Sequence, residues 1–92
     1  MAGIAFLLVD IIEIYVWLVI ASAVLSWLIT FNVVDPRNQI VGTIGNFLHR
    51  ITEPALAPIR RILPDLGGID LSPVVLIFGL FFLQRIIIAI FV

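Results

Sequence analysis

The chain has 92 residues, of which 63% are hydrophobic and 12% are charged, and its formal net charge is −1. A soluble domain of this size buries too little surface to hide so many apolar side chains, so we expect much of the chain to face lipid or protein partners. The charge balance argues against nucleic-acid binding, and the absence of cysteine excludes disulfides, thiolate catalysis and cysteine-based metal or iron–sulfur sites.

Residues 3–30 form an almost continuous apolar run, longer than the ~20 residues that cross a bilayer core. The alternative is a signal peptide, because the Ala-Ser-Ala sequence at 21–23 resembles a cleavage site. A signal peptide begins with basic residues and lacks acids, whereas Asp10 and Glu13 lie inside this run. We therefore predict a retained transmembrane helix at about 3–30.

The middle segment, residues 35–64, carries four of the five basic residues. The Asp-Pro pair at 35–36 is a helix-start signal, and the apolar residues that follow recur at helical spacing. This pattern predicts an amphipathic helix at about 36–51. The Thr-Glu-Pro sequence at 52–54 is a second start signal and predicts another short amphipathic helix at about 53–63. Both helices suit the interface of a membrane.

A turn containing Gly67-Gly68 follows, and Ser72 is the predicted cap of a last helix at about 73–92. This helix has ~20 residues, enough for one crossing, and contains Gln84 and Arg85. The sequence thus predicts an all-α membrane protein with a single domain. Two transmembrane helices form a hairpin, joined by a loop with two short amphipathic interfacial helices. Because basic residues concentrate in the loop, we expect the loop in the cytoplasm and both termini on the opposite side.

Charged side chains inside the two spans are the first candidate site. Arg85 lies ~18 Å along the last helix, and Glu13 can lie at a similar depth on the first. Intramembrane charges usually find partners, so we predict an interhelical pair between Glu13 and Arg85, with Asp10 or Gln84 nearby. Two alternatives stay open: an ion path lined by Asp10, Glu13 and Arg85 in a homo-oligomer, and docking to another subunit or snorkelling to the interface.

The polar side chains of the middle segment are the second candidate site. They form a platform for lipid headgroups or a protein partner, consisting of Arg37, Asn46, His49, Arg50, Arg60 and Arg61. Arg60 can instead pair with Glu53 or Asp65 within the segment. His49 is the only histidine, so haem or metal ligation there requires ligands from another chain.

Motifs for catalysis are not evident in the sequence. It contains no glycine-rich phosphate loop, no nucleophile–base–acid set and no metal-ligand spacing. Ser22 and Ser26 lie four residues apart in an apolar helix without a base, a spacing that lets a neighbouring helix approach closely. We therefore predict a helix-packing role for both serines, a non-enzyme, and no metal, cofactor or small-molecule substrate.

Four motifs between residues 35 and 70 resemble the YggT (YlmG-like) family of small integral membrane proteins. They are Asp35-Pro36-Arg37-Asn38, Thr52-Glu53-Pro54, Pro58-Ile59-Arg60-Arg61 and Gly67-Gly68-Ile69-Asp70. The resemblance covers essentially the whole chain and departs at Gln39, where relatives often carry a second proline. It implies a multi-pass protein of bacteria or plastids, with the bacterial inner membrane as the expected location.

Members of that family are associated with cell or plastid division, nucleoid distribution, osmotic tolerance and maturation of a plastid cytochrome complex. This breadth implies a non-catalytic scaffold, assembly factor or accessory subunit that docks on a larger membrane complex through the loop platform. The expected partners are membrane lipids, other integral membrane proteins or further copies of the chain. The alternative function is the homo-oligomeric channel that uses the intramembrane charges.

Overall fold

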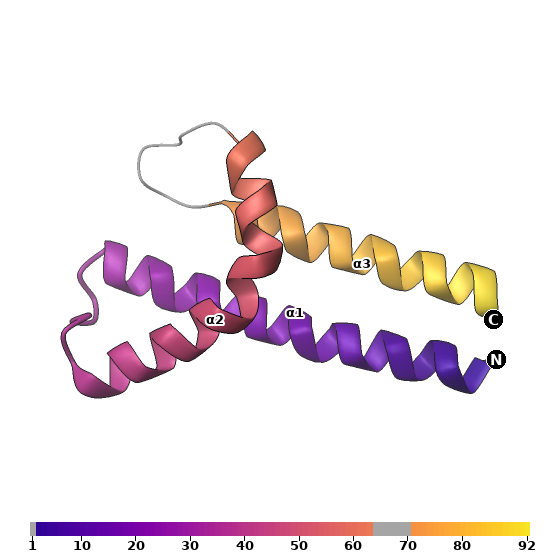
Figure 1. Ribbon diagram of the computed structural model, residues 1–92, viewed down its shortest axis with the longest axis horizontal. Coiled ribbons are helices and arrows are strands. Elements are labelled where there is room, and N and C mark those ends of the chain that lie inside the picture. The colour runs from indigo at the N-terminus through magenta and orange to yellow at the C-terminus, as the bar shows by residue number, and fades with distance from the viewer. Residues whose placement is uncertain (1, 64–70) are drawn as a thin grey trace.

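The computed structural model describes residues 2–63 and 71–92 and contains three helices within them. They are α1 (Ala2–Thr30), α2 (Gln39–Ile62) and α3 (Ser72–Phe91), arranged as shown in Figure 1. The described part measures about 47 × 30 × 18 Å along its principal axes. The turn predicted around Gly67-Gly68 lies outside the described residues.

Helices α1 and α3 lie side by side and antiparallel, so that the two termini meet at one end of the molecule (Figure 1). The buried residues of α1 are small or β-branched and recur at helical spacing: Ala5, Val16, Val19 and Ala23. Small side chains let helix backbones approach closely, which is how helices associate where no water drives them together. These residues therefore mark the face of α1 that packs against the other two helices.

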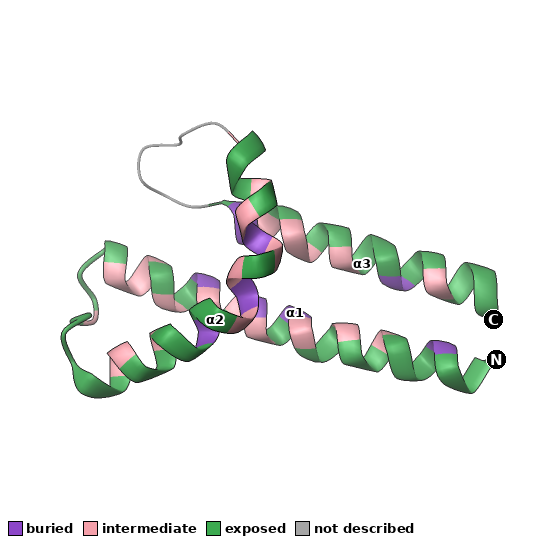
Figure 2. Ribbon diagram, viewed as in Figure 1, coloured by how far each residue is buried: buried purple, intermediate pink, exposed green. Residues whose placement is uncertain are grey.

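Most of the remaining surface of α1 and α3 is apolar and exposed (Figure 2). Large side chains such as Trp17, Phe78 and Phe82 are 63%, 69% and 67% exposed, respectively. Both helices are long and apolar enough to cross a membrane. Soluble monomers rarely expose contiguous apolar patches of this extent, so the exposed surface favours a lipid or protein environment.

The loop after α1 turns back through a left-handed residue. Asn32 has a φ of 60°, and its N–H donates to the Ile29 carbonyl at 3.1 Å, while the Val33 N–H donates to the Leu28 carbonyl at 2.9 Å. These two bonds form a Schellman motif that satisfies the last carbonyls of α1. Asparagine tolerates this conformation better than most residues do. The motif ends α1 and directs the chain toward α2.

Helix α2 begins later than the sequence predicted. Asn38, not Asp35, is the N-cap: its side chain accepts from the backbone N–H groups of Ile40 and Val41 at 2.9 and 3.4 Å. Asp35 instead accepts from the Arg37 N–H at 2.9 Å within a turn. Asp and Asn are both good N-cap residues. Asn38 is the cap here because the Asp35 side chain is engaged in the turn with Arg37.

Helix α2 is one continuous element rather than the two short helices that the sequence predicted. Pro54 and Pro58 lie inside it, and the helix bends sharply near its middle (Figure 1). Thr52 does not cap a second helix, because its hydroxyl donates back to the Leu48 carbonyl at 2.7 Å. Such back-bonding and the missing proline N–H groups bend a helix without ending it. The bend sends the second half of α2 toward α3.

Helix α3 begins at Ser72, one residue before the predicted start. Leu71 occupies the cap position without a side-chain cap hydrogen bond, and proline stands near the helix start, where no N–H is needed. Ser72 is fully buried and therefore faces the protein rather than capping the helix toward solvent. The start of α3 thus packs into the region where all three helices meet.

Candidate functional site at the bend of α2

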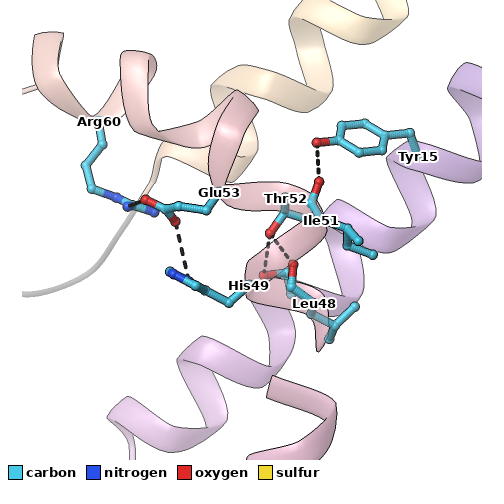
Figure 3. A network of polar contacts seen from close by, with 8 residues as sticks. Tyr15, Leu48, His49, Ile51, Thr52, Glu53 and Arg60 are labelled. Atoms are coloured by element: carbon cyan, nitrogen blue, oxygen red, sulfur yellow. Dashed lines mark hydrogen bonds and ion pairs between the residues drawn. The ribbon is translucent and has the colours of Figure 1, made fainter. Parts of the chain in front are cut away.

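The bend of α2 is tied to α1 by a tyrosine. The Tyr15 hydroxyl donates to the backbone carbonyl of Ile51 at 2.8 Å, across 36 residues of sequence (Figure 3). Proline at position 54 cannot donate the backbone hydrogen bond that the Arg50 carbonyl would receive in a regular helix. The Tyr15 hydroxyl therefore supplies a hydrogen-bond donor next to the position where proline has removed a backbone N–H. This contact holds the bend of α2 against α1.

A second contact to α1 comes from Thr52, which is 1% exposed. Its hydroxyl donates to the Leu48 carbonyl at 2.7 Å (Figure 3) and lies 3.4 Å from the Ser22 Oγ on α1. A buried hydroxyl with its hydrogen bonds satisfied does not oppose folding, whereas an unsatisfied one costs about 1–3 kcal/mol. The serine predicted to serve helix packing thus lies against α2.

Glu53 joins two turns of α2 beside the bend. Its Oε1 accepts from Arg60, and its Oε2 lies 3.5 Å from the His49 Nδ1 (Figure 3). Of the two partners considered for Arg60 in the sequence, Glu53 contacts it, and Asp65 lies outside the described residues. Because these side chains are partly exposed, each pair contributes no more than about 1 kcal/mol. Their effect is to hold His49 and Arg60 in place.

These residues border a cleft of about 190 Å³ between α1, α2 and the start of α3. Ser22, Ser26, His49, Thr52 and Glu53 contribute polar atoms to its lining, and leucine, isoleucine and tryptophan side chains contribute the apolar part. Within residues 2–63 and 71–92, no group of three or more acidic or histidine side chains is placed to hold a metal ion. The cleft is thus amphipathic, with polar and apolar side chains in its lining.

The predicted platform residues are all exposed, but they differ in their contacts. Arg37 pairs with Asp35 at 3.4 Å in the turn before α2. Asn46, Arg50 and Arg61 lie on the outer surface of α2, and neither arginine forms an ion pair with any residue that the structure describes. Arg50 and Arg61 are therefore the platform charges available to another molecule.

The charged residues of α1 and α3 pair differently from the sequence prediction. Gln84, which is 9% exposed, donates to the Val9 carbonyl at 3.0 Å and to the Glu13 Oε2 at 3.3 Å. Among the described residues, no ion pair joins Glu13 to Arg85. Arg85 follows Gln84 by ~100° around the helix, so only one of the two can face α1. Glu13, Arg85 and Asp10 all remain exposed.

The Tyr15 contact leads to a direct prediction. Tyr15→Phe should lower the free energy of unfolding by about 1 kcal/mol, because it removes a single hydrogen bond at the bend and leaves the ring in place. Unfolding by dodecyl sulfate in mixed micelles, followed by circular dichroism, measures the change. Tyr15→Leu is the comparison that also removes the ring. A Tyr15→Phe variant as stable as the original chain would show that the hydroxyl does not hold the bend.

Comparison with known proteins identifies the family of the chain. A family model described as CCB3/YggT matches residues 1–91. This chain belongs to the CCB3/YggT family.

Its relatives are longer proteins. A Vibrio alginolyticus protein described as an uncharacterized protein in the proC 3′ region is 42% identical over 66 residues, covering 72% of this chain and 31% of the relative. The Escherichia coli K12 protein YggT is 35% identical over 80 residues, covering 87% of this chain and 38% of the relative. The CCB3/YggT chain thus spans about a third of the length of these relatives. No solved structure matches it.

The names of these relatives state no activity, substrate or partner. The surfaces of this CCB3/YggT chain are therefore the guide to its function. The most informative are the exposed apolar sides of α1 and α3, the two arginines of α2 that form no ion pair with a described residue (Arg50 and Arg61), and the exposed charges at Asp10, Glu13 and Arg85.

Proposed function

We propose that the chain is a non-catalytic integral membrane protein that acts as a scaffold or accessory subunit, with α2 as its recognition platform. α1 and α3 cross the bilayer, and the bend of α2 holds the platform at one membrane surface. The observation that carries the proposal is the division of α2 into an exposed apolar stripe and an exposed polar side bearing Arg50 and Arg61.

The apolar stripe of the first half of α2 does not pack on α1. Ile40, Ile44 and Phe47 follow one another at helical spacing and are 70%, 48% and 59% exposed. An apolar stripe of this kind, beside a polar face, is typical of a helix lying at the boundary between headgroups and acyl chains. Leu48 on the neighbouring arc is buried and holds the helix to the protein. One side of α2 therefore meets lipid and the opposite side meets the aqueous phase.

The polar side of α2 suits a protein partner with acidic side chains at the membrane surface. Glu53 engages Arg60, which leaves Arg50 and Arg61 as the exposed charges with no ion-pair partner among the described residues. Arginine is favoured at interfaces because its planar guanidinium binds carboxylates through two parallel hydrogen bonds. The concentration of basic residues in α2 also supports a cytoplasmic position for this side of the protein, with both termini on the opposite side.

Purification in mild detergent followed by mass spectrometry tests the platform. We expect a partner present in stoichiometric amount, whose recovery falls about tenfold with Arg61→Glu or Arg50→Glu, because a reversed charge repels the acidic partner. Arg37→Glu makes the same charge change at a residue already paired with Asp35 and should leave the recovery unchanged. Equal recovery with all three variants would contradict recognition through α2.

A further inference from the structure

The face of the α1–α3 pair opposite to α2 carries charges of both signs. Glu13 on α1 and Arg85 on α3 are both exposed, and Gln84 links the two helices at the same level by its contact with Glu13. Gln84 occupies Oε2 of the carboxylate, so Oε1 remains open to another donor. In the bilayer placement proposed above, these two charges lie within the hydrocarbon core, where charged side chains need partners.

Helix geometry places Glu13 and Arg85 on the same face. Glu13 and Tyr15 are separated by ~160° around α1, and Tyr15 contacts α2, so Glu13 points away from α2. Arg85 lies ~100° beyond Gln84 around α3. Because α3 runs antiparallel to α1, the sense of rotation reverses between them, and this step turns Arg85 toward the side where Glu13 lies. Asp10 lies ~60° further round α1, at the edge of the same face.

Exposed aromatic side chains accompany both charges. Trp17 follows Glu13 by one turn, and Phe81 and Phe78 precede Arg85 by one and two turns. All three are exposed. Since the helices are antiparallel, the aromatic residues of both helices are displaced from the charges in the same direction. This direction is toward the end of the α1–α3 pair where α2 lies (Figure 1). On each helix of this face, a charged residue is thus followed by aromatic residues in the same direction. The same face of a second copy can therefore place opposite charges and aromatic side chains against it.

We propose that this face, formed by Asp10, Glu13 and Trp17 of α1 with Phe78, Phe81 and Arg85 of α3, binds a second copy of the chain. A two-fold axis parallel to the helices sets each α1 against the α3 of the other copy. Glu13 of each copy then meets Arg85 of the other at the same depth, so the contact contains two identical ion pairs. Trp17 meets the phenylalanines of the opposite α3. The platform on α2 stays outward on both copies.

The proposal is tested by reversing the charge at position 13 or 85 in chains that carry either a donor dye or an acceptor dye. The chain lacks cysteine, so Val33→Cys in the exposed loop gives one labelling position for a donor or an acceptor dye. Energy transfer is measured in vesicles of phosphatidylethanolamine and phosphatidylglycerol at high dilution. We expect transfer between copies of the original chain, and an association constant about tenfold lower for Glu13→Arg alone or Arg85→Glu alone, because each creates like charges across the contact.

Mixing the two variants should restore the transfer. The Glu13→Arg chain is positive at both positions and the Arg85→Glu chain is negative at both, so only the mixed pair has opposite charges at both contacts. A pair formed within one chain would not give this result. Recovery in the mixture also shows that both variants insert and fold. Failure of the mixture to recover, while circular dichroism shows both to be helical, would overturn the proposal.

Milder variants and a matched control complete the test. Glu13→Gln and Arg85→Gln should each weaken association at least about threefold without creating repulsion. Unchanged association in both would overturn the proposal even if the reversed-charge variants fail to insert. The same exchange made with Asp35→Arg and Arg37→Glu, an exposed pair in the turn before α2, should leave association unchanged in single and mixed samples. Copies that show no transfer before any substitution would equally overturn it.

Discussion

Gln84→Glu should destabilise the contact between α1 and α3 by about 2–4 kcal/mol. Gln84 donates to both the Val9 carbonyl and the Glu13 carboxylate, and a carboxylate at position 84 donates to neither. It also places a second acid beside Glu13 in a buried position, where charge is costly. We expect a lower midpoint in dodecyl sulfate unfolding followed by circular dichroism.

Two comparison variants separate the causes of this loss. Gln84→Leu removes the hydrogen bonds without adding an acid and should cost only about 0.5–1.5 kcal/mol. Glu13→Gln introduced together with Gln84→Glu restores a donor–acceptor pair and should recover part of the stability. If Gln84→Glu were no worse than Gln84→Leu, the contact with Glu13 would not link the helices.

Pro54→Ala combined with Pro58→Ala should straighten α2. The substitutions restore backbone N–H groups to a helix that now lacks two donors, so a regular hydrogen-bond ladder can form through the bend. A straight helix from Gln39 to Ile62 would span ~35 Å between these positions. Spin labels at Gln39→Cys and Ile62→Cys report this distance. We expect it to be clearly shorter than ~35 Å in the original chain and to approach this value in the proline variant.

The straightened helix should also lose recognition. Its second half would move away from the start of α3 and carry Arg61 with it, so partner recovery should fall as it does for Arg61→Glu. Ala57→Gly is a suitable control, because it loosens α2 near the bend without restoring a donor. An unchanged label distance in the proline variant would show that Thr52 and the contacts to α1 suffice to bend α2.

The outline of the fold could be predicted because it depends on apolar run length alone. Residues 3–30 and 73–92 were expected as helices, and the structure has them at 2–30 and 72–91. A long apolar run predicts a helix from the composition of many residues together. The differences of one residue between the predicted and observed helix ends therefore do not affect the prediction of the helix itself. The hairpin predicted from two crossings agrees with the antiparallel course of α1 and α3 (Figure 1).

The details of α2 were wrong because several start signals compete. Asp35 and Asn38 are both good caps, and Thr52 before proline is typical of a helix start as well as of a bend. The choice depends on which hydrogen bonds form: Asp35 closes a turn, and Thr52 bonds back to Leu48. The sequence does not reveal that choice.

For Glu13, the sequence prediction placed Gln84 nearby, as the structure shows, but chose Arg85 as the direct partner. Sequence spacing gives the depth of a residue along a helix but not the rotation of that helix against its neighbour. Gln84 and Arg85 have nearly the same depth, and packing of α3 on the small residues of α1 selects Gln84. The acceptor of Tyr15 is a backbone carbonyl at a helix bend, which has no side-chain signature at all.

The placement of α2 at the membrane surface is the central claim, and accessibility of single cysteines tests it most directly. Asn46→Cys and Ile44→Cys lie ~160° apart around α2, on its polar and apolar sides. In vesicles that expose the cytoplasmic side, a membrane-impermeant maleimide should modify Asn46→Cys rapidly and Ile44→Cys at least about tenfold more slowly, because lipid shields the apolar stripe. Equal, rapid modification of both would contradict the claim.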